Sequence, residues 1–141
     1  MPADKFVLKD ASVTVNSVDL SAYCTQVAMD MPTDEVDGSG MGAQQKVTMR
    51  GLSDASMTVS FLQSFMAAKV DATLWPLSTT ETPFNVVVKP ASAVVSATNP
   101  TYTMSALLFN YAPISGSLGE AATTEVVFRN ASQTGIVKAT S

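Results

Sequence analysis

The sequence predicts a mainly β fold, an antiparallel β-sandwich or barrel of about seven strands with one α-helix at Ser64–Trp75 and a long inter-strand loop at Thr33–Gln45. Apolar and polar residues alternate over several short segments, as in strands that are buried on one face. Turn residues separate these segments, and only one segment has helical spacing. The length of 141 residues fits one domain, residues 1–141, with a polar tail that frays from about residue 130.

The first part of the chain contains two short predicted strands and one helical turn. Phe6–Leu8 has strand character, and Ser12–Asn16 alternates so that its two valines share a face. Asp19 has a side chain suited to cap a helical turn over Leu20–Tyr23.

Two alternating segments flank the long loop. In the first, Val27, Met29 and Met31 share a face, and Pro32 ends the strand because proline cannot donate to a ladder. The second flank covers Lys46–Met49. The loop between them exceeds the usual hairpin length of about two to five residues, which is typical of a functional or disordered segment.

The next predicted elements are a turn, a strand and the helix. Arg50–Asp54 is predicted to turn, and the strand after it has the clearest alternating face in the chain, made of Ala55, Met57, Val59 and Phe61. In the helix Ser64–Trp75, the residues at helical spacing are Phe65, Ala68, Ala72 and Trp75. Ser64 is the expected cap, and Pro76 is expected to stop the helix.

The last third of the chain contains three more predicted strands. Phe84–Val88 is a nearly continuous apolar run, which predicts a strand buried on both faces. Ala91–Pro100 is predicted to be a loop. Thr101–Tyr111 and Thr123–Arg129 alternate, and the second places Thr124, Val126 and Phe128 on one face.

The composition suggests a protein with little charge on its surface. Hydrophobic residues make up 46% and charged residues 14%, against about 25% charged residues in an average soluble domain. A β protein rich in Ser, Thr, Ala and Val explains these values, and so does a chain whose surface is covered in an oligomer, because interface cores are depleted in charge.

Charge, cysteine content and hydropathy exclude several classes. The net charge is −4 and the eight basic residues are scattered, whereas nucleic-acid binders carry a cationic patch. Cys24 is the single cysteine, so no internal disulfide forms, and it is expected to be a small buried hydrophobe. We expect no membrane segment, since no apolar run reaches roughly 18 residues, and no secretory signal, which favours synthesis and use, or assembly, in a cytoplasm.

No residue cluster indicates catalysis or a cofactor. Gly38–Gly42 contains three glycines but lacks the lysine and hydroxyl residue of a phosphate-binding loop. The acidic stretch Asp34–Gly38 departs from a calcium loop, because Gln44 stands where a bidentate glutamate belongs. The chain has no histidine, which removes the usual catalytic base and the commonest metal ligand. We therefore expect neither an enzyme, nor a cofactor, nor a metal site.

Five short pieces stand in order over roughly residues 19–128: Asp19–Tyr23, Asp34–Asp37, Gly51–Ser56, Val70–Leu77 and Ser96–Tyr102. Taken together, these pieces resemble phage tail tube proteins of long-tailed, siphovirus-type bacteriophages, which share a fold with contractile-tail and type VI secretion tube proteins. The resemblance implies a virion tail protein that assembles into stacked hexameric rings, in which one sheet of each copy joins its neighbours around a bore. The resemblance further implies that DNA passes through this bore without specific binding, and that the tape-measure and tail terminator proteins are partners.

The resemblance also implies that the long loop reaches the adjacent ring. The expected inter-subunit residues are Asp34, Glu35, Asp37, Gly38, Gly40, Met41, Gly42, Gln44 and Gln45. Met41 is an apolar side chain at the loop tip, suited to fill a pocket of a neighbour. The basic residues expected to meet the loop acids across copies are Lys46, Arg50, Lys69 and Arg129.

Two alternatives remain at this point. A tail terminator or head-tail connector ring has the same kind of fold and ends growth instead of propagating it. A monomeric β-sandwich that binds a carbohydrate or small ligand needs exposed aromatic residues, and the candidates are Trp75, Tyr23, Tyr102 and Tyr111.

Overall fold

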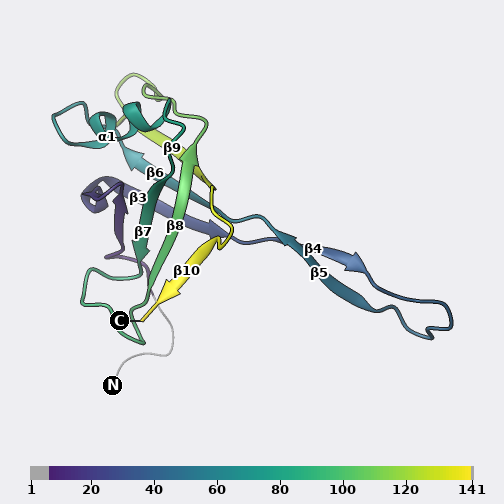
Figure 1. The fold of residues 1–141 in the computed structure, drawn as a ribbon. Coiled ribbons are helices and arrows are strands. Elements are labelled where there is room, and N and C mark those ends of the chain that lie inside the picture. Colours follow the sequence, from purple (N-terminus) through teal and green to yellow (C-terminus); the bar gives the residue numbers. More distant parts are fainter. Residues whose placement is uncertain (1–6, 141) are drawn as a thin grey trace.

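The computed structural model describes residues 7–140, which form an antiparallel β structure with one short α-helix (Figure 1). The main-sheet strands are β1 Ser12–Val15, β2 Val18–Asp19, β3 Cys24–Asp30, β6 Ser56–Leu62, β7 Phe84–Lys89, β8 Thr101–Leu108, β9 Thr123–Asn130 and β10 Ile136–Ala139. Their order is β2-β1-β7-β8-β9-β6-β3, and β10 pairs with β8. β4 Thr33–Asp37 and β5 Thr48–Ser53 form a separate two-stranded sheet. The predicted antiparallel, mainly β class is confirmed, with more strands than expected.

The main sheet folds over itself into two layers that enclose the core. β8 pairs with β9 only at Ala106–Leu108 and with β10 at Thr101–Met104. β3, β6 and β9 therefore leave the direction of β7 and β8 and cross behind them (Figure 1). The rings of Phe84 and Phe128 meet edge to face, with centroids 5.8 Å apart.

The strands with clear alternation bury the predicted faces. Met57, Val59 and Phe61 of β6 are fully buried, as are Val13 and Val15 of β1. On β9, the buried residues are Thr124, Val126 and Phe128. Period-two alternation thus identified the core face of these strands, because one face of each strand packs on the core and the other face is less buried.

The chain between β1 and β3 contains the predicted helical turn as a 3-10 helix at Ser21–Tyr23. The Asp19 carboxylate accepts a hydrogen bond from the Ser21 backbone N–H at 2.9 Å and another from the Ser21 hydroxyl, which lower the pKa of Asp19. The predicted strand Phe6–Leu8 lies partly outside the described residues, and residues 7 and 8 are not in a strand.

The helix is shorter than predicted and buries a different face. α1 covers Val70–Leu77, and its N-cap is Lys69 without a side-chain cap, in place of Ser64. Its buried residues are Val70, Thr73, Leu74 and Leu77. Residues 64–69 are not helical, and Ala68 in this segment has a positive φ of 61°. The predicted stop at Pro76 is wrong, because Pro76 lies inside the helix, which continues to Leu77.

Two further strand predictions need correction. β7 is buried on one face only, since Asn85 is exposed and Val87 half-buried beside the buried Phe84, Val86 and Val88. β8 ends at Leu108, and Phe109 beyond it is 74% exposed. Both segments carry apolar residues on the outer face that the core does not cover.

The predicted loop, turn and tail all contain strands. Thr33–Asp37 of the predicted loop is β4, so the remaining loop covers residues 38–47. The predicted turn Arg50–Asp54 is mostly part of β5. The C-terminal segment includes β10, which pairs with β8 from Ile136↔Met104 to Ala139↔Thr101.

We predict that Phe128→Ala destabilises the protein by about 3–5 kcal/mol, because it leaves a cavity between the layers and removes the ring contact with Phe84. Urea unfolding followed by far-ultraviolet circular dichroism measures the change. Val94→Ala, at a side chain that is 88% exposed, is the matched control. Equal midpoints for the two variants would show that Phe128 does not hold the layers together.

Candidate assembly surfaces

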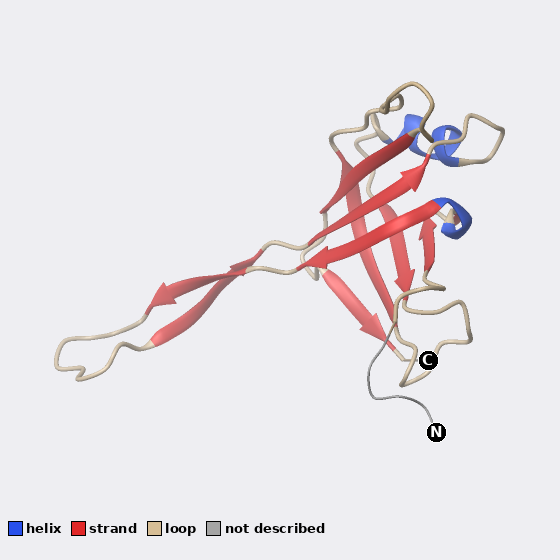
Figure 2. Cartoon of the chain, turned by 180° about the vertical axis from the view of Figure 1, so that it is seen from behind, coloured by secondary structure: helices blue, strands red, loops and turns tan. Residues whose placement is uncertain are grey.

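The most prominent feature outside the two layers is a hairpin arm, defined here as residues 33–53. Figure 2 shows β4 and β5 projecting away from the main sheet, with their connecting loop at the far end. The register pairs Thr33 with Ser53, Glu35 with Arg50 and Asp37 with Thr48, and a hydrogen bond from the Gly38 N–H to the Val47 carbonyl (2.8 Å) extends the pairing. The arm is therefore an ordered hairpin and not a structureless loop.

Polar contacts within the arm hold the hairpin in register. The Arg50 guanidinium donates to the Thr33 hydroxyl at 3.1 Å, and that hydroxyl lies 2.9 Å from the Ser53 hydroxyl. Near the tip, the Ser39 backbone N–H donates to Asp37 at 2.9 Å, and hydrogen bonds from Ser39 lower the pKa of Asp37. The arm needs no contact with the main sheet to form these bonds.

The arm exposes an unusual number of large apolar side chains. They are Val36, Met41, Val47, Met49 and Leu52. Met41 at the tip is fully exposed, and Leu52 is 84% exposed. Contiguous exposed apolar surface is typical of interaction sites in soluble proteins. The arm thus presents large apolar side chains to solvent along its length.

All nine predicted inter-subunit residues lie on the arm. Asp34, Glu35 and Asp37 are on β4, and the other six are in the loop. Of the four predicted basic partners, Lys46 and Arg50 belong to the same arm, and Arg50 lies opposite Glu35 of its own chain. Their contacts with a second copy remain a prediction.

The other two basic residues lie on the body of the protein. The Lys69 ammonium lies 5.9 Å above the ring of Tyr23. The Arg129 guanidinium is 3.9 Å from the carboxylate of Asp54, at the base of the arm. Both members of that pair are largely exposed, so it contributes little to stability.

Sequence reasoning missed the open edge of β3. Within the described residues β3 pairs only with β6, from Cys24↔Phe61 to Asp30↔Ser56, with an irregularity at Thr25. Its residues are exposed or half-buried on both faces. An unpaired strand edge presents free N–H and C=O groups that accept another strand. The weak burial of both β3 faces depends on three-dimensional pairing, which alternation alone does not reveal.

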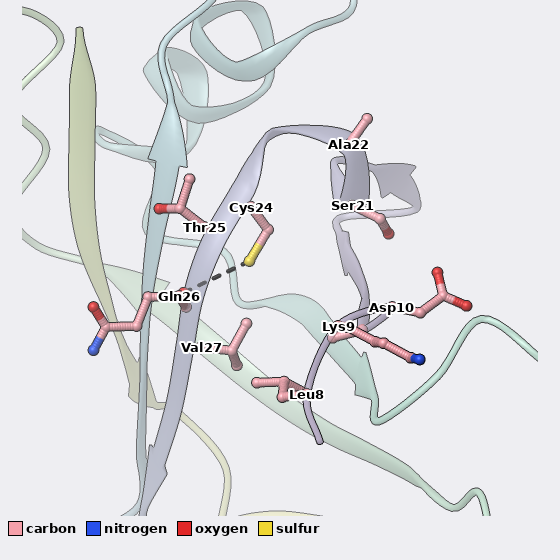
Figure 3. A pocket seen from close by; sticks show the side chains of 10 residues that line it. Leu8, Lys9, Asp10, Ser21, Ala22, Cys24, Thr25, Gln26 and Val27 are labelled. Atoms are coloured by element: carbon pink, nitrogen blue, oxygen red, sulfur yellow. Dashed lines mark hydrogen bonds between the residues drawn. The ribbon is translucent and has the colours of Figure 1, made fainter. Parts of the chain in front are cut away.

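A shallow cavity of about 320 Å³ lies between β3 and the segment 8–11 (Figure 3). The Cys24 thiol in its wall donates to the Gln26 carbonyl at 3.6 Å, and burial raises the pKa of Cys24. The thiol is half-buried against the core, where the sequence predicted a buried one. Over residues 7–140, His, Cys, Asp and Glu side chains form no group of three that is suited to hold a metal ion.

The outer face of β3, β6 and β9 is polar. The register aligns Gln26, Ser60 and Glu125 in one row, and Asp30, Ser56 and Arg129 in another. Between them lies a third row of Ala28, Thr58 and Val127. This face carries hydroxyl groups, two acids and one base, so it is hydrated without being strongly charged.

At the other end of β6, a hydrogen-bond network joins three segments. The Gln63 amide donates to the Tyr111 hydroxyl at 3.0 Å, and that hydroxyl donates to Asp71 of α1 at 2.8 Å. The ring of Trp75 meets the Tyr111 ring edge to face at 6.5 Å. Burial, together with Asp71, raises the pKa of Tyr111 to about 12.

Comparison with solved structures shows which fold this is. The chain matches the SPP1 tail tube with a TM-score of 0.73 at 9% identity, covering 97% of this chain and 80% of that one. It matches the anti-feeding prophage tube terminating cap with a TM-score of 0.71 at 12% identity, covering 100% and 95%. A chain in the tail of an empty gene transfer agent particle, determined with C6 symmetry, matches with a TM-score of 0.63 at 10% identity, covering 84% and 82%.

The chain has the tail-tube fold. At such low identities the likeness establishes the fold alone. No protein-family model matches the sequence, and neither does any curated protein sequence. The tail-tube fold here has no helix within residues 7–140 that is long and apolar enough to cross a membrane.

We predict that Gly51→Ala loosens the arm. A methyl group at Gly51 comes within 3.0 Å of the Asp34 Cβ and the Val36 Cγ2, and 3.3 Å from the Asp34 carbonyl oxygen. Hydrogen–deuterium exchange should become faster for amides of residues 33–53 while the rest of the protein keeps its protection. Gly40→Ala is the control, because nothing lies within 4 Å of its added methyl group. If Gly51→Ala exchanges as slowly as Gly40→Ala, then Gly51 is not closely packed against Asp34 and Val36, and the prediction is wrong.

We also predict a late tyrosine titration that belongs to Tyr111. The folded state holds the Tyr111 phenol proton more tightly than the unfolded chain does. The raised pKa therefore adds to the free energy of unfolding below about pH 10, and this contribution is lost as the pH rises towards 12. Phenolate absorbance should show a transition near pH 12 that Tyr111→Phe removes. Asp71→Asn should lower its midpoint, because the carboxylate raises the pKa of Tyr111. A Tyr111 transition near pH 10 contradicts this prediction.

Proposed function

We propose that this protein is a non-enzymatic structural component of a phage-type tail, located in the virion, whose copies assemble into stacked hexameric rings that form the tail tube. The observation that supports the proposal is the arm, an ordered hairpin whose apolar side chains are left exposed by the rest of residues 7–140. Tape-measure and tail terminator proteins are its expected partners. No cofactor takes part.

The arm and the open edge of β3 support repeated association of identical copies. The two surfaces differ, so a contact that uses one of them need not block the other. Head-to-tail contacts between unlike surfaces produce rings when the rotation closes and filaments when it does not. The C6 symmetry of a tail with the same fold favours six copies in each ring.

The polar outer face of β3, β6 and β9 is suited to line the bore. Duplex DNA carries one negative charge per about 1.7 Å, and a row of lysines would hold it in place. Ser56, Thr58 and Ser60 offer neutral hydroxyl groups to water, and Asp30 and Glu125 repel phosphate. A net charge of −4 fits a conduit through which DNA moves without specific binding.

A second candidate is a tube terminator, which forms a single ring and stops growth. The observation in its favour is the match to the anti-feeding prophage tube terminating cap, which covers 100% of this chain. The two functions predict different particles, long tubes for the first and isolated rings for the second.

Deleting residues 38–44, from Gly38 to Gln44, should leave a folded protein that no longer forms tubes. The deletion removes the arm tip and leaves Gln45, Lys46 and Val47 to connect β4 to β5. Negative-stain electron microscopy and sedimentation measure assembly, circular dichroism measures folding, and Gly40→Ala is the control. Normal tubes from the deletion variant contradict the role of the arm, and isolated rings from the unaltered protein support the terminator.

A further inference from the structure

A second exposed apolar surface lies at the α1 end of the sheet. We call it the helix-end patch, and its members come from the segments 65–66, α1 and 109–118. They are Phe65, Met66, Trp75, Phe109, Ile114 and Leu118. Trp75 is the least exposed of them at 57%, and Leu118 is fully exposed. These six large side chains are exposed on three segments, whereas apolar residues on an ordinary surface are exposed singly.

Hydrogen bonds between neighbouring residues hold together the segments that carry the helix-end patch. The Gln63 N–H donates to the Ala122 carbonyl at 2.9 Å, and the Asp71 N–H donates to the Ser64 carbonyl at 3.0 Å. Tyr111 joins Asp71 and Gln63, as described above. These bonds connect the three segments that carry the apolar side chains. The apolar groups are therefore presented to solvent from an organised surface.

The arm and the helix-end patch lie at opposite ends of one strand. β6 begins at Ser56, next to the base of the arm, and ends at Leu62, next to the patch. Seven residues of strand separate them by about 20 Å. The arm also points away from α1 (Figure 1), so it cannot cover the patch of its own chain. Over residues 7–140, no part of the chain covers either surface.

We propose that the helix-end patch is the surface that receives the arm tip of a second copy of this chain. The inference rests on the proposed function and names the receiving partner of the arm. Met41 brings an exposed apolar side chain to the arm tip, and methionine adapts to an irregular surface. Lys69, directly before α1 and with its ammonium 5.9 Å above the ring of Tyr23, supplies a counter-charge for Asp37, the β4 acid nearest the arm tip.

The contact is directional. A copy whose arm is docked still has a free helix-end patch, and a copy whose patch is filled still has a free arm. Contacts between such unlike surfaces add subunits in one direction and do not close on a dimer. The arm and the patch therefore account for stacking, and they leave the open edge of β3 for contacts of another kind.

A mixed cross-linking experiment tests the proposal. Two proteins are prepared in a Cys24→Ala background, one with Met41→Cys and the other with Ile114→Cys, and they are mixed, assembled and treated with a short bismaleimide. We expect a cross-linked heterodimer in this mixture. The control replaces Ile114→Cys by Val94→Cys, at an equally exposed side chain on the 91–100 loop, and should give several-fold less product.

A second pair of variants measures the same contact without a cross-linker. Ile114→Asp should abolish or greatly reduce tube formation, because it places a charge in the receiving surface, whereas Val94→Asp should assemble normally. Both side chains are exposed, so folding should be unchanged by circular dichroism.

The outcomes separate this inference from the proposed function. Cross-linking at Met41 and Ile114 with loss of tubes in Ile114→Asp supports it. Normal tubes that show no such cross-link, or that tolerate Ile114→Asp, overturn the receiving surface and leave the tube function standing. Failure of the unaltered protein to form rings or tubes at any salt concentration overturns both.

Discussion

Burial of Met57, Val59 and Phe61 between the two layers is the constraint on which the other surfaces depend. These side chains fix which face of β6 points inward, and the pairing with β3 and β9 then fixes the outward face of three strands. A shift of register by one residue would exchange Thr58 for Val59 on the outer face and bury hydroxyl groups. The hydrophobic core thereby determines the polarity of the outer surface.

Alternation of period two identified the core strands because each of them has protein on one side and solvent on the other. The same reasoning failed for Phe84–Val88, where Val87 faces outward beside the exposed Asn85 and the run only looked buried on both faces. It failed for α1 because the exposed Phe65 and Trp75 have helical spacing although they do not pack on the sheet. Exposed apolar residues mimic a core pattern, and here they belong to a surface.

Strands that depend on a distant partner were the hardest to predict. β4 and β5 contain Asp34, Glu35 and Gly51, which favour loops, and only their mutual pairing makes them strands. β10, whose sequence is IVKA, likewise becomes a strand by pairing with β8, although the residues just before it are mostly polar. The position of the arm was predicted from its acidic and glycine-rich sequence, whereas its strand pairing, the open edge of β3 and the helix-end patch are seen only in the three-dimensional structure. The local sequence therefore predicts where polar and apolar residues lie, but it does not predict which distant segments pair as strands.

The junction between the arm and the body has a mechanical consequence. The ladder of β3 and β6 stops at Asp30 and Ser56, that of β4 and β5 starts at Thr33 and Ser53, and the Asp54 N–H bonds the Pro32 carbonyl at 2.8 Å between them. Pro32 cannot donate a bond in return. Bending therefore concentrates at this point, where little pairing resists it. In the proposed tube, subunits linked through such hinges would share curvature among many small rotations, so the assembly would flex while each folded body keeps its shape.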